Sequence, residues 1–594
     1  MSSKPGVAPL PAGPWPTAER PAAEPPSAEA AGAAQRSPLA GLRIVGILTL
    51  LSRILGLARD VTMAAVFGNG AVMDAFSVAF RVPNLARRVF GEGALTAAFL
   101  PMFVREYERH GPESAWKLAS AVLNALAVAL CALVLAGELL LWATAGFGGG
   151  GPEARLLTGL TAVMLPYLVL VCLAAQIGAV MNALGHFAWP AFSPMLLNVV
   201  WIGTLWWVVP ALDSPTAQVY AVAASVVLAG VVQLLAPWRA LRRLGFRYSF
   251  GWRDMRSRVA DLVRSMLPIV VGLSITQLNT LADSVIAWSF SEPERAVEAS
   301  VPEADGLRTV PDATDPDAAR SVFSVSAGTA SALYFAQRMY QFPLGIFGVA
   351  LGTVLFPLLA RHAEAGRLDR FRDDLGLGLR LVMAVGLPAS VGLVVLARPL
   401  TALLFQHGEF DARDAETTAG MIAAYSTGVW AYCGLLIVHR GYYAVGDRMT
   451  PLRVGLIAVV LHLGLNFLLL WLLGGAGLAL ATALAAMFQL GLVVWLVQSR
   501  IGPLDWRRLG AAALRASAAC GVMTLACLAA MEYTPAFQGR LTGRAIAVVW
   551  PMLAGAGAYL LAAWLLRLEE VWLIFRPSNV RQVSAGRPGD VKSG

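Results

Sequence analysis

The chain contains fourteen apolar stretches in succession, each long enough to cross a membrane as an α-helix, and this pattern restricts the fold more than any other feature. A helix needs about 20 apolar residues to span a hydrocarbon core about 30 Å thick. Hydrophobic residues make up 57% of the 594-residue chain and charged residues only 14%, whereas about 25% of the residues in a soluble domain are charged. The sequence therefore predicts an all-α polytopic membrane protein with about 14 transmembrane helices. The stretches lie at about residues 41–66, 73–104, 118–146, 155–183, 188–211, 217–240, 263–290, 327–360, 376–400, 416–444, 451–473, 476–499, 508–530 and 543–567.

The connecting loops alternate in charge, which predicts how the chain is oriented. Residues 238–264 follow the sixth stretch and carry eight arginines, and the loops after the second, eighth, tenth and twelfth stretches also carry Arg or Lys. The intervening loops contain few basic residues, and the longest of them, residues 291–326, is acidic. Because cytoplasmic loops are enriched in Lys and Arg, we expect both termini in the cytoplasm and the acidic loop on the periplasmic side.

Two pairs of short motifs indicate an internal repeat. "ALTAAFLPMFVR" (94–105) resembles "ALGTVLFPLLAR" (350–361), and "ALGHFAWP" (183–190) resembles "AVGDRMTP" (444–451). The members of each pair lie six helices apart, so both copies have the same orientation and form two parallel six-helix lobes, as in many transporters. The predicted segments are a disordered cytoplasmic tail rich in Pro and Ala (1–40), an N-lobe (41–240), a basic cytoplasmic loop (241–262), a C-lobe that includes the acidic loop (263–500), two further helices (501–570) and a second cytoplasmic tail (571–594).

Motifs for catalysis, metal binding and nucleotide binding are missing from the sequence. The five cysteines form no CxxC pair and the six histidines are scattered, so neither a disulfide framework nor a zinc site is indicated. The net charge of +9 follows the orientation of the loops and does not point to nucleic acid. We therefore expect a transporter and not an enzyme.

The first two stretches carry charged residues that a membrane helix rarely contains. A charged side chain at the bilayer centre costs at least about 2.5–3.5 kcal/mol on insertion scales. Some of these charges can pair, as Arg88 and Glu92 can at a spacing of four, while Arg53 and Asp60 share a helix face at a spacing of seven. The arginines exceed the carboxylates, however, and arginines in a membrane require a water-filled cavity. Since guanidinium groups match phosphate geometry, the pattern favours an intramembrane site for a phosphate-bearing substrate over purely structural ion pairs.

Three segments identify the chain by resemblance. "SRILGLARD", "DAFSVAFRVPNLARRVFGEGALTAAFLP" and "FPLGIFGVALGTVLFP" resemble the MurJ/MviN family of lipid II flippases, within the multidrug/oligosaccharidyl-lipid/polysaccharide exporter superfamily. The resemblance extends over residues 41–570. It implies two lobes around a central cationic cavity. It also implies that the undecaprenyl-diphosphate-linked peptidoglycan precursor moves from the cytoplasmic to the periplasmic leaflet of a bacterial inner membrane by alternating access.

The same resemblance implies roles for individual residues. Arg53, Arg59, Arg87 and Arg338 would bind the diphosphate, and helices 13 and 14 would form a groove for the lipid tail. Many relatives have an acidic residue just before the last of these arginines, whereas this chain has Gln337, which should make the cavity more positive. The implied polar and gating positions are Ser52, Asp60, Asp74, Asn84, Arg88 and Glu92. The implied sodium ligands are Asp283, His462, Asn466 and Thr482, although Asp283 could equally be the counter-ion of Arg338.

Other functions remain open on sequence grounds. A flippase for another polyprenyl-diphosphate-linked glycan would look much the same. A cation-coupled drug exporter of the same superfamily would need an acidic or aromatic cavity, and a membrane scaffold or pore would need a neutral one. For the favoured function we expect lipid II and the membrane as partners, together with the peptidoglycan-synthesis machinery, and a monomer that does not bind nucleic acid. We expect no cofactor, with Na⁺ or the membrane potential as the driving force.

Overall fold

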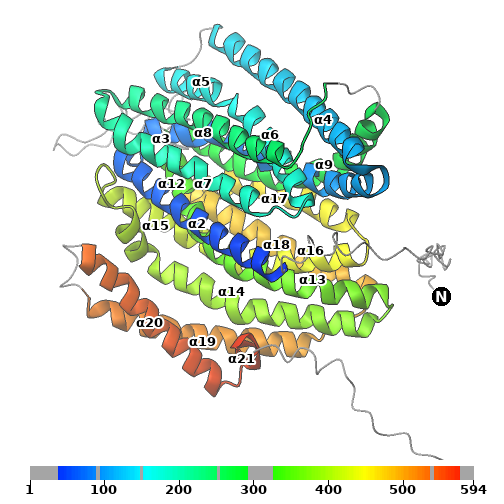
Figure 1. Cartoon of the computed structure of the whole chain (residues 1–594). Helices are drawn as coiled ribbons and strands as arrows, with labels where there is room; N and C mark the ends of the chain where they lie inside the picture. Colours follow the sequence, from blue (N-terminus) through cyan, green and yellow to red (C-terminus); the bar gives the residue numbers. More distant parts are fainter. Residues whose placement is uncertain are drawn as a thin grey trace, which may run out of the picture.

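The computed structural model describes residues 38–88, 94–146, 151–250, 255–291, 325–534 and 541–575. These residues are almost entirely helical, which confirms the expected all-α membrane fold (Figure 1). Eleven of the described helices or helix pairs are long and apolar enough to span a membrane. The first half contains α2 (Pro38–Phe67), α3 (Ala71–Ala86), α4 (Ala94–Gly146), α5 (Pro152–Met164), α6 (Tyr167–Ala183), α7 (Ala188–Gly203), the short segments η2 (Thr204–Val208) and η3 (Val209–Ala211), and α8 (Pro215–Arg243).

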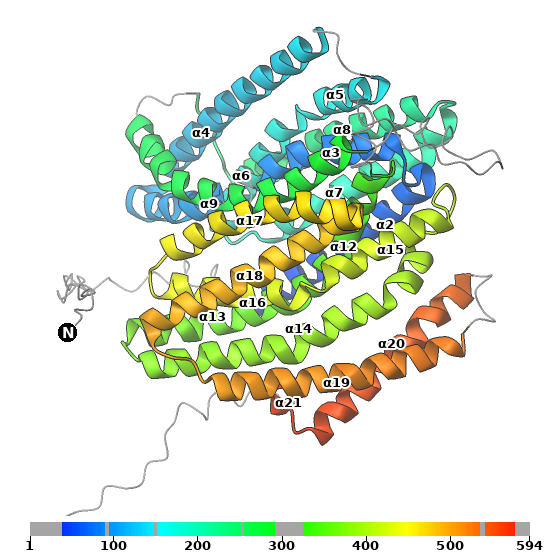
Figure 2. The ribbon, with the colours of Figure 1, turned by 180° about the vertical axis from the view of Figure 1, so that it is seen from behind.

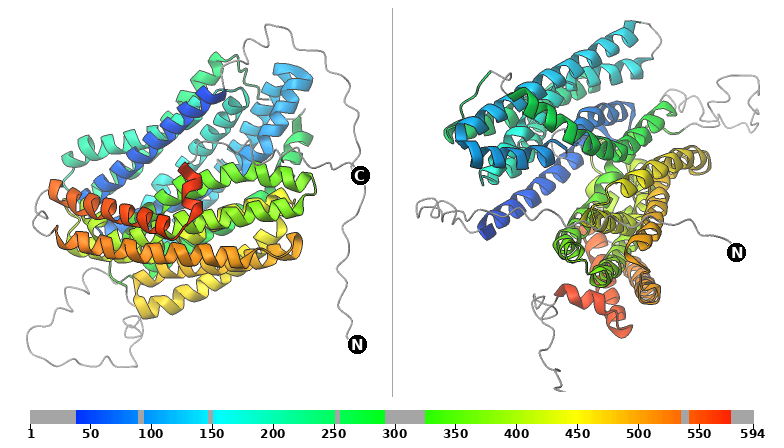
Figure 3. Two further views of the ribbon diagram at one scale, coloured as in Figure 1. Left: turned by 90° about the horizontal axis from the view of Figure 1, so that it is seen from below. Right: turned by 90° about the vertical axis from the view of Figure 1, so that its right-hand side faces the viewer.

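The second half repeats this order and adds three helices. In Figures 1 and 2, α19 and α20 lie against α14, on the side away from the first half. Seen from the side, α4–α8 gather in one group and α12–α20 in another (Figure 3). The elements are α9 (Arg256–Ser289), α12 (Thr329–Pro343), η5 (Leu344–Gly348), α13 (Val349–Glu364), α14 (Leu368–Leu404), α15 (Ala412–Ser426), α16 (Val429–Ala444), α17 (Met449–Leu473), α18 (Gly475–Ile501), α19 (Trp506–Glu532), α20 (Leu541–Leu565) and α21 (Glu569–Phe575).

The second apolar stretch departs from a regular α-helix just after Pro83. α3 contains Pro83 and ends at Ala86, and it is followed by a π-helical turn at residues 87–88. The π-helical segment η5 likewise follows Pro343 directly. A proline lacks the N–H that the regular helix ladder needs, and such positions often carry wider turns. α4 then begins at Ala94 and includes the third stretch, with a break at Gly111 (φ 79°).

The internal repeat is visible in the turns and in the packing. Gly185 and Gly446, at the same place in the paired motifs, have φ values of 79° and 78°. In each turn the next backbone N–H donates to the carbonyl oxygen five residues back, at 2.8 Å and 3.0 Å, which is a helix-ending Schellman geometry. Corresponding helices also pack together in both halves, although the exact domain boundaries stay a prediction. The packed pairs are α3–α5 and α12–α15, α4–α6 and α14–α16, α6–α8 and α16–α18, α2–α7 and α9–α17, and α7–α8 and α17–α18.

The two lobes contact each other at the end that the loop charges predict to be periplasmic. The backbone N–H of Asn69 donates to Asp414 Oδ2 at 3.0 Å, and its side-chain amide donates to Thr418 Oγ1 at 3.0 Å. The backbone N–H of Glu409 donates to the carbonyl oxygen of Ala65 at 2.9 Å. These bonds join the α2–α3 turn to the α14–α15 turn and so hold the lobes together at that end.

Candidate functional site

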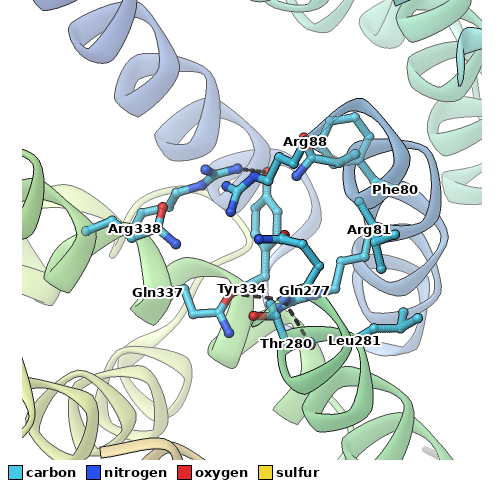
Figure 4. Close-up of a pocket in the computed structure, with 12 residues that line it drawn as sticks. Phe80, Arg81, Arg88, Gln277, Thr280, Leu281, Tyr334, Gln337 and Arg338 are labelled. Carbon is cyan, nitrogen blue, oxygen red and sulfur yellow. Dashed lines mark hydrogen bonds between the residues drawn. The ribbon is translucent and has the colours of Figure 1, made fainter. Parts of the chain in front are cut away.

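A pocket lies between the lobes, where α3, α9 and α12 meet (Figure 4). Its twelve lining residues include three arginines and no carboxylate. The empty volume of the pocket is ≈ 490 Å³, including the part that is open to solvent. Electrostatics therefore favour an anion in this pocket. The lining residues are Phe80, Arg81, Asn84, Leu85, Arg88, Gln277, Thr280, Leu281, Tyr334, Gln337, Arg338 and Gln341.

One carboxylate, that of Asp60, holds arginines from both lobes. Arg59 Nη2 lies 2.6 Å from Asp60 Oδ1, and Arg338 Nε lies 3.0 Å from Asp60 Oδ2. The hydroxyl of Tyr334 donates to Asp60 Oδ1 at 3.1 Å and accepts from Arg338 Nη2 at 3.2 Å. Asp60 is 1% exposed, so its carboxylate is desolvated and the charge-assisted hydrogen bonds that it accepts are strong. Two cations share one anion, which leaves a net positive charge beside the pocket.

Two α7 residues support this cluster, and the sequence analysis missed both. Asn198 accepts from Arg59 Nη1 at 3.1 Å and donates to the carbonyl oxygen of Ser52 at 3.1 Å. The Arg59 guanidinium also lies 4.5 Å from the centroid of the Trp201 ring, a cation–π distance. Asn198 is an isolated amide in an apolar stretch, which was the one available signal. Arg59 is thereby fixed in orientation, and Ser52 is placed near it through its backbone.

The other two predicted diphosphate ligands occupy different positions. Arg53 is exposed, and its guanidinium lies so close to Gly345 of η5 that a Cβ there would meet it. Arg87 donates through Nε and Nη2 to Asn84 Oδ1, at 3.2 Å each. Arg88 lines the pocket, while Glu92, its expected partner, lies outside the described residues. The four predicted arginines thus lie on α2, in the turn after α3 and on α12, and their role in binding stays a prediction.

Asp74, expected among the polar positions of the cavity, is bound to the first turn of α12. Its carboxylate accepts from the backbone N–H of Gly328 at 2.8 Å and from that of Ser331 at 2.6 Å. These N–H groups have no partner within their own helix, and the positive end of the helix dipole favours a carboxylate. Asp74 on α3 therefore joins the two lobes as a helix cap, at the opposite end of α3 from Arg87.

The four residues of the implied sodium site lie together where α9, α17 and α18 meet. Asn466 Nδ2 donates to Asp283 Oδ1 at 2.8 Å, and Thr482 Oγ1 donates to Asp283 Oδ2 at 3.0 Å. His462 Nε2 lies 3.1 Å from Asp283 Oδ1. Arg338 pairs with Asp60 instead, so the structure does not favour Asp283 as its counter-ion.

This group has the chemistry of a hard-cation site. Buried Asn466 Oδ1 has no hydrogen-bond partner among the described residues, and a carboxylate, an amide oxygen and a hydroxyl are oxygen donors of the kind that hard cations prefer. Among the residues that the structure describes, no three His, Cys, Asp or Glu side chains lie close enough together to hold a metal ion. The residues therefore fit sodium better than a transition metal, and sodium binding itself stays a proposal.

The fold and the pocket define the class of protein: a polytopic all-α membrane protein with an arginine-lined pocket between two lobes, built on the fold of solved membrane transporters. The structure matches one described as lipid II flippase MurJ in an inward closed conformation, with a TM-score of 0.68 and 22% identity, covering 89% of this chain and 99% of that one. It also matches an inward-facing multidrug resistance MATE family transporter, with a TM-score of 0.58, 12% identity and coverages of 77% and 98%. At these low sequence identities, the two matches establish a similar fold and nothing about function.

The sequence comparisons identify the family. The family model described as lipid II flippase MurJ matches residues 63–542, and the chain belongs to this family. It is 34% identical over 465 residues to the probable lipid II flippase MurJ of Vibrio cholerae, covering 76% of this chain and 81% of that protein. It is 31% identical over 448 residues to the lipid II flippase MurJ of Burkholderia cenocepacia, with coverages of 74% and 79%. The family expected from the sequence is thus confirmed.

Proposed function

We propose that this protein is a lipid II flippase, which moves the undecaprenyl-diphosphate-linked peptidoglycan precursor from the cytoplasmic to the periplasmic leaflet. The observation that carries the proposal is the pocket between the lobes, lined by three arginines and no carboxylate. A diphosphate is the part of such a lipid that carries concentrated negative charge, and arginine binds phosphate oxygens in a bidentate manner. Membership of the MurJ family supports this substrate over other anions.

In this proposal the diphosphate binds to Arg53, Arg59, Arg87 and Arg338, of which Arg338 lines the pocket itself. Asp60 holds the guanidinium groups of Arg59 and Arg338 in place without neutralising both, so each side chain is oriented before the substrate arrives. Such preorganisation lowers the entropy lost on binding. The polar positions Ser52, Asn84 and Arg88 lie beside these arginines, whereas Asp74 stabilises the contact between α3 and α12.

Alternating access would carry the headgroup across. The hydrogen bonds from Asn69 to Asp414 and Thr418 keep the predicted periplasmic end closed, so the headgroup enters from the cytoplasmic side. Binding of the anion lowers the repulsion among the arginines and allows the lobes to rock. The membrane potential acts on charge at about 2.3 kcal/mol per elementary charge per 100 mV, and it favours outward movement of an anion. Sodium at Asp283 and Asn466 would add the charge of a coupling ion.

The proposal includes a cellular setting: a multi-pass protein of the bacterial inner membrane with both termini in the cytoplasm, acting as a monomer beside the peptidoglycan-synthesis machinery. The pocket argues against the cation-coupled drug exporter, because a cationic drug would meet three arginines. A flippase for another polyprenyl-diphosphate-linked glycan would use the same arginines, so the test must separate it from lipid II.

Complementation tests the proposal. A bacterium depleted of its own lipid II flippase is supplied with the parent chain, with alanine variants of Arg53, Arg59, Arg87 and Arg338, or with Arg367→Ala, a control at an exposed arginine before α14. We expect the parent and the control to restore growth and the four variants to fail at equal expression in the membrane. Failure of a well-expressed parent would contradict lipid II as the substrate. Growth with all four variants would contradict the site.

A further inference from the structure

Arg81 is a buried pocket arginine that the proposed diphosphate site does not use. It lies on α3 and is 7% exposed. Its Nη1 donates to Gln337 Oε1 on α12 at 2.9 Å and to the carbonyl oxygen of Thr280 on α9 at 3.3 Å. Figure 4 shows the side chain reaching from α3 across to these two residues. A single nitrogen of the guanidinium thus makes both of these hydrogen bonds from the N-lobe to the C-lobe.

The other edge of this guanidinium has no partner. Nε and Nη2 are buried and make no hydrogen bond among the described residues, and within that part of the chain no ion pair is formed by Arg81. The N–H groups of Nε and Nη2 point in the same direction, and this edge is one that the two oxygens of a phosphate or carboxylate accept in parallel. A buried cation left in this condition is costly unless something else supplies the charge.

Gln337 explains why no protein carboxylate supplies that charge. Its amide nitrogen donates to the hydroxyl of Tyr425 at 3.1 Å, which directs the amide oxygen toward Arg81. The amide oxygen accepts one hydrogen bond and brings no negative charge to Arg81, so among the described residues the carboxylate charge that acts on this arginine is that of Asp283, which forms no ion pair with it. A glutamate at this position would both accept the hydrogen bond and neutralise Arg81. The neutral residue keeps the cation available to a ligand in the same pocket.

We propose that Arg81 is a further oxyanion-binding residue of the pocket, and that its free guanidinium edge binds a phosphate or carboxylate group of the transported headgroup. This inference rests on the proposed function and adds a binding residue to that site. The free edge is covered in this conformation, and Arg81 and its partners Gln337 and Thr280 belong to different lobes. Separation of the lobes uncovers the edge, so the anion binds Arg81 in a more open state than the one described.

The test measures the binding of inorganic pyrophosphate and of geranylgeranyl diphosphate to the purified full-length protein by calorimetry. Arg81→Gln removes the cation, and Gln337→Glu supplies a permanent countercharge without changing the arginine. Gln341→Glu is the matched control, because it adds the same charge to the pocket wall one helical turn away on α12. Arg367→Gln controls for the loss of a surface arginine.

We expect Arg81→Gln and Gln337→Glu to weaken the binding of both probes by at least about tenfold, as the loss of one charge-assisted bidentate contact predicts. Gln341→Glu should weaken it less, through repulsion at a distance, and Arg367→Gln should have no effect. An effect on pyrophosphate alone would mean that Arg81 serves a free anion and would overturn its assignment to the headgroup. Equal losses in Gln337→Glu and Gln341→Glu, or parental binding by Arg81→Gln, would also overturn it.

Failure of this inference is distinguishable from failure of the proposed function. If the parent chain restores growth while Arg81→Gln binds both probes normally, Arg81 is not a ligand and the flippase function stands. If the parent fails to restore growth but its binding of both probes depends on Arg81, the oxyanion site stands and the lipid is a different one.

Discussion

Asp60 in the N-lobe and Asp283 in the C-lobe are both 1% exposed within membrane helices, yet their partners differ in kind. Asp60 is paired with two arginines, Arg59 and Arg338. Asp283 is contacted by an amide, a hydroxyl and an imidazole. The first carboxylate orients cations and leaves an excess of positive charge for an anion. The second pairs with no arginine or lysine in the described part of the chain and is the place where a mobile cation would add most.

Replacement of Asp60 should have the largest effect. Asp60→Ala leaves two arginines without their shared carboxylate, and breaking a buried ion pair typically costs about 3–5 kcal/mol. We expect a large drop in the apparent melting temperature in detergent and loss of complementation. Asp369→Ala is the control, since Asp369 is exposed and pairs with Arg372 within one helix, where ion pairs contribute little. Similar melting temperatures for the two variants would show that the Asp60 cluster does not stabilise the fold.

Asp283 should determine whether sodium stabilises the protein. A ligand present at about 100 times its Kd stabilises the folded state by about 2.7 kcal/mol. We expect the parent to melt at a higher temperature in sodium chloride than in choline chloride at the same ionic strength. Asp283→Asn should remove this difference, and Asp414→Asn, at the contact between the lobes, should retain it. If sodium still raised the melting temperature of Asp283→Asn, the ion would have to bind at a different site.

The paired turns should respond equally to the same substitution if the lobes are true repeats. Gly185→Ala and Gly446→Ala would each force a side chain into the left-handed region, at a cost of about 1–2 kcal/mol, and a Cβ at either position would meet no atom within 4 Å. Gly464→Ala, in the interior of α17 and also in open space, should be neutral or stabilising. The melting temperatures of these three variants check the expectations. A large effect in only one turn would argue against equivalent roles.

The smallest expected effect on stability comes from replacing the residue that follows Gly185 or Gly446, which is His186 in the N-lobe and Asp447 in the C-lobe. Asp447 accepts from the backbone N–H groups of Met449 and Thr450 at 3.1 Å and 3.0 Å. Burial raises the pKa of Asp447, but the hydrogen bonds from Thr450 and the charge of Arg500 outweigh burial, so its pKa lies below the ordinary value. The stabilisation by the carboxylate is therefore present at neutral pH and is lost as the pH falls through the lowered pKa.

Asp447→Asn should accordingly lower the melting temperature at pH 7, on the scale of about 1 kcal/mol for a helix cap. The difference from the parent should persist down to about pH 4, near the pKa of an unfolded aspartate, and shrink below it. His186→Asn, at the same place in the N-lobe turn, should change little, because the start of α7 has no side-chain cap. A difference between Asp447→Asn and the parent that does not vary with pH would contradict the charge-based account.

The sequence predicted the membrane fold well, because apolar length is a local property, whereas its count of about 14 helices is approximate: eleven spans among the described residues are long and apolar enough to cross a membrane. It did not predict the π-helical turn at residues 87–88, or that the fourth and tenth stretches would each divide into two helices, α5–α6 and α15–α16. Such breaks depend on which neighbours satisfy the freed backbone groups. The charged helices α2, α3 and α9 fall outside the set of apolar spans.

The candidate site was predictable in its charges and not in its pairings. Arg53 and Asp60 share a spacing that suggests contact, but Asp60 pairs with the adjacent Arg59 and with Arg338 of the other lobe. Long-range pairs of this kind depend on how two bundles meet, which periodicity within one helix does not encode. Tyr334 and Asn198 complete the cluster through hydrogen bonds with more than one partner each, and neither belongs to a motif. The group around Asp283 came from the family resemblance, and the structure brings its members together.

The attachment of the last helices has a practical consequence for measuring motion. α19 and α20 pack on each other and on α14, and buried Tyr559 of α20 donates to the carbonyl oxygen of Ala384 on α14 at 2.5 Å. Arg380 of α14 also pairs with Glu570 of α21 at 3.0 Å. A spectroscopic label on α20 therefore reports the position of the C-lobe from its outer surface, remote from the pocket. Distances from that label to α14 give an internal reference that stays constant, while distances to α5 record each rotation of one lobe against the other.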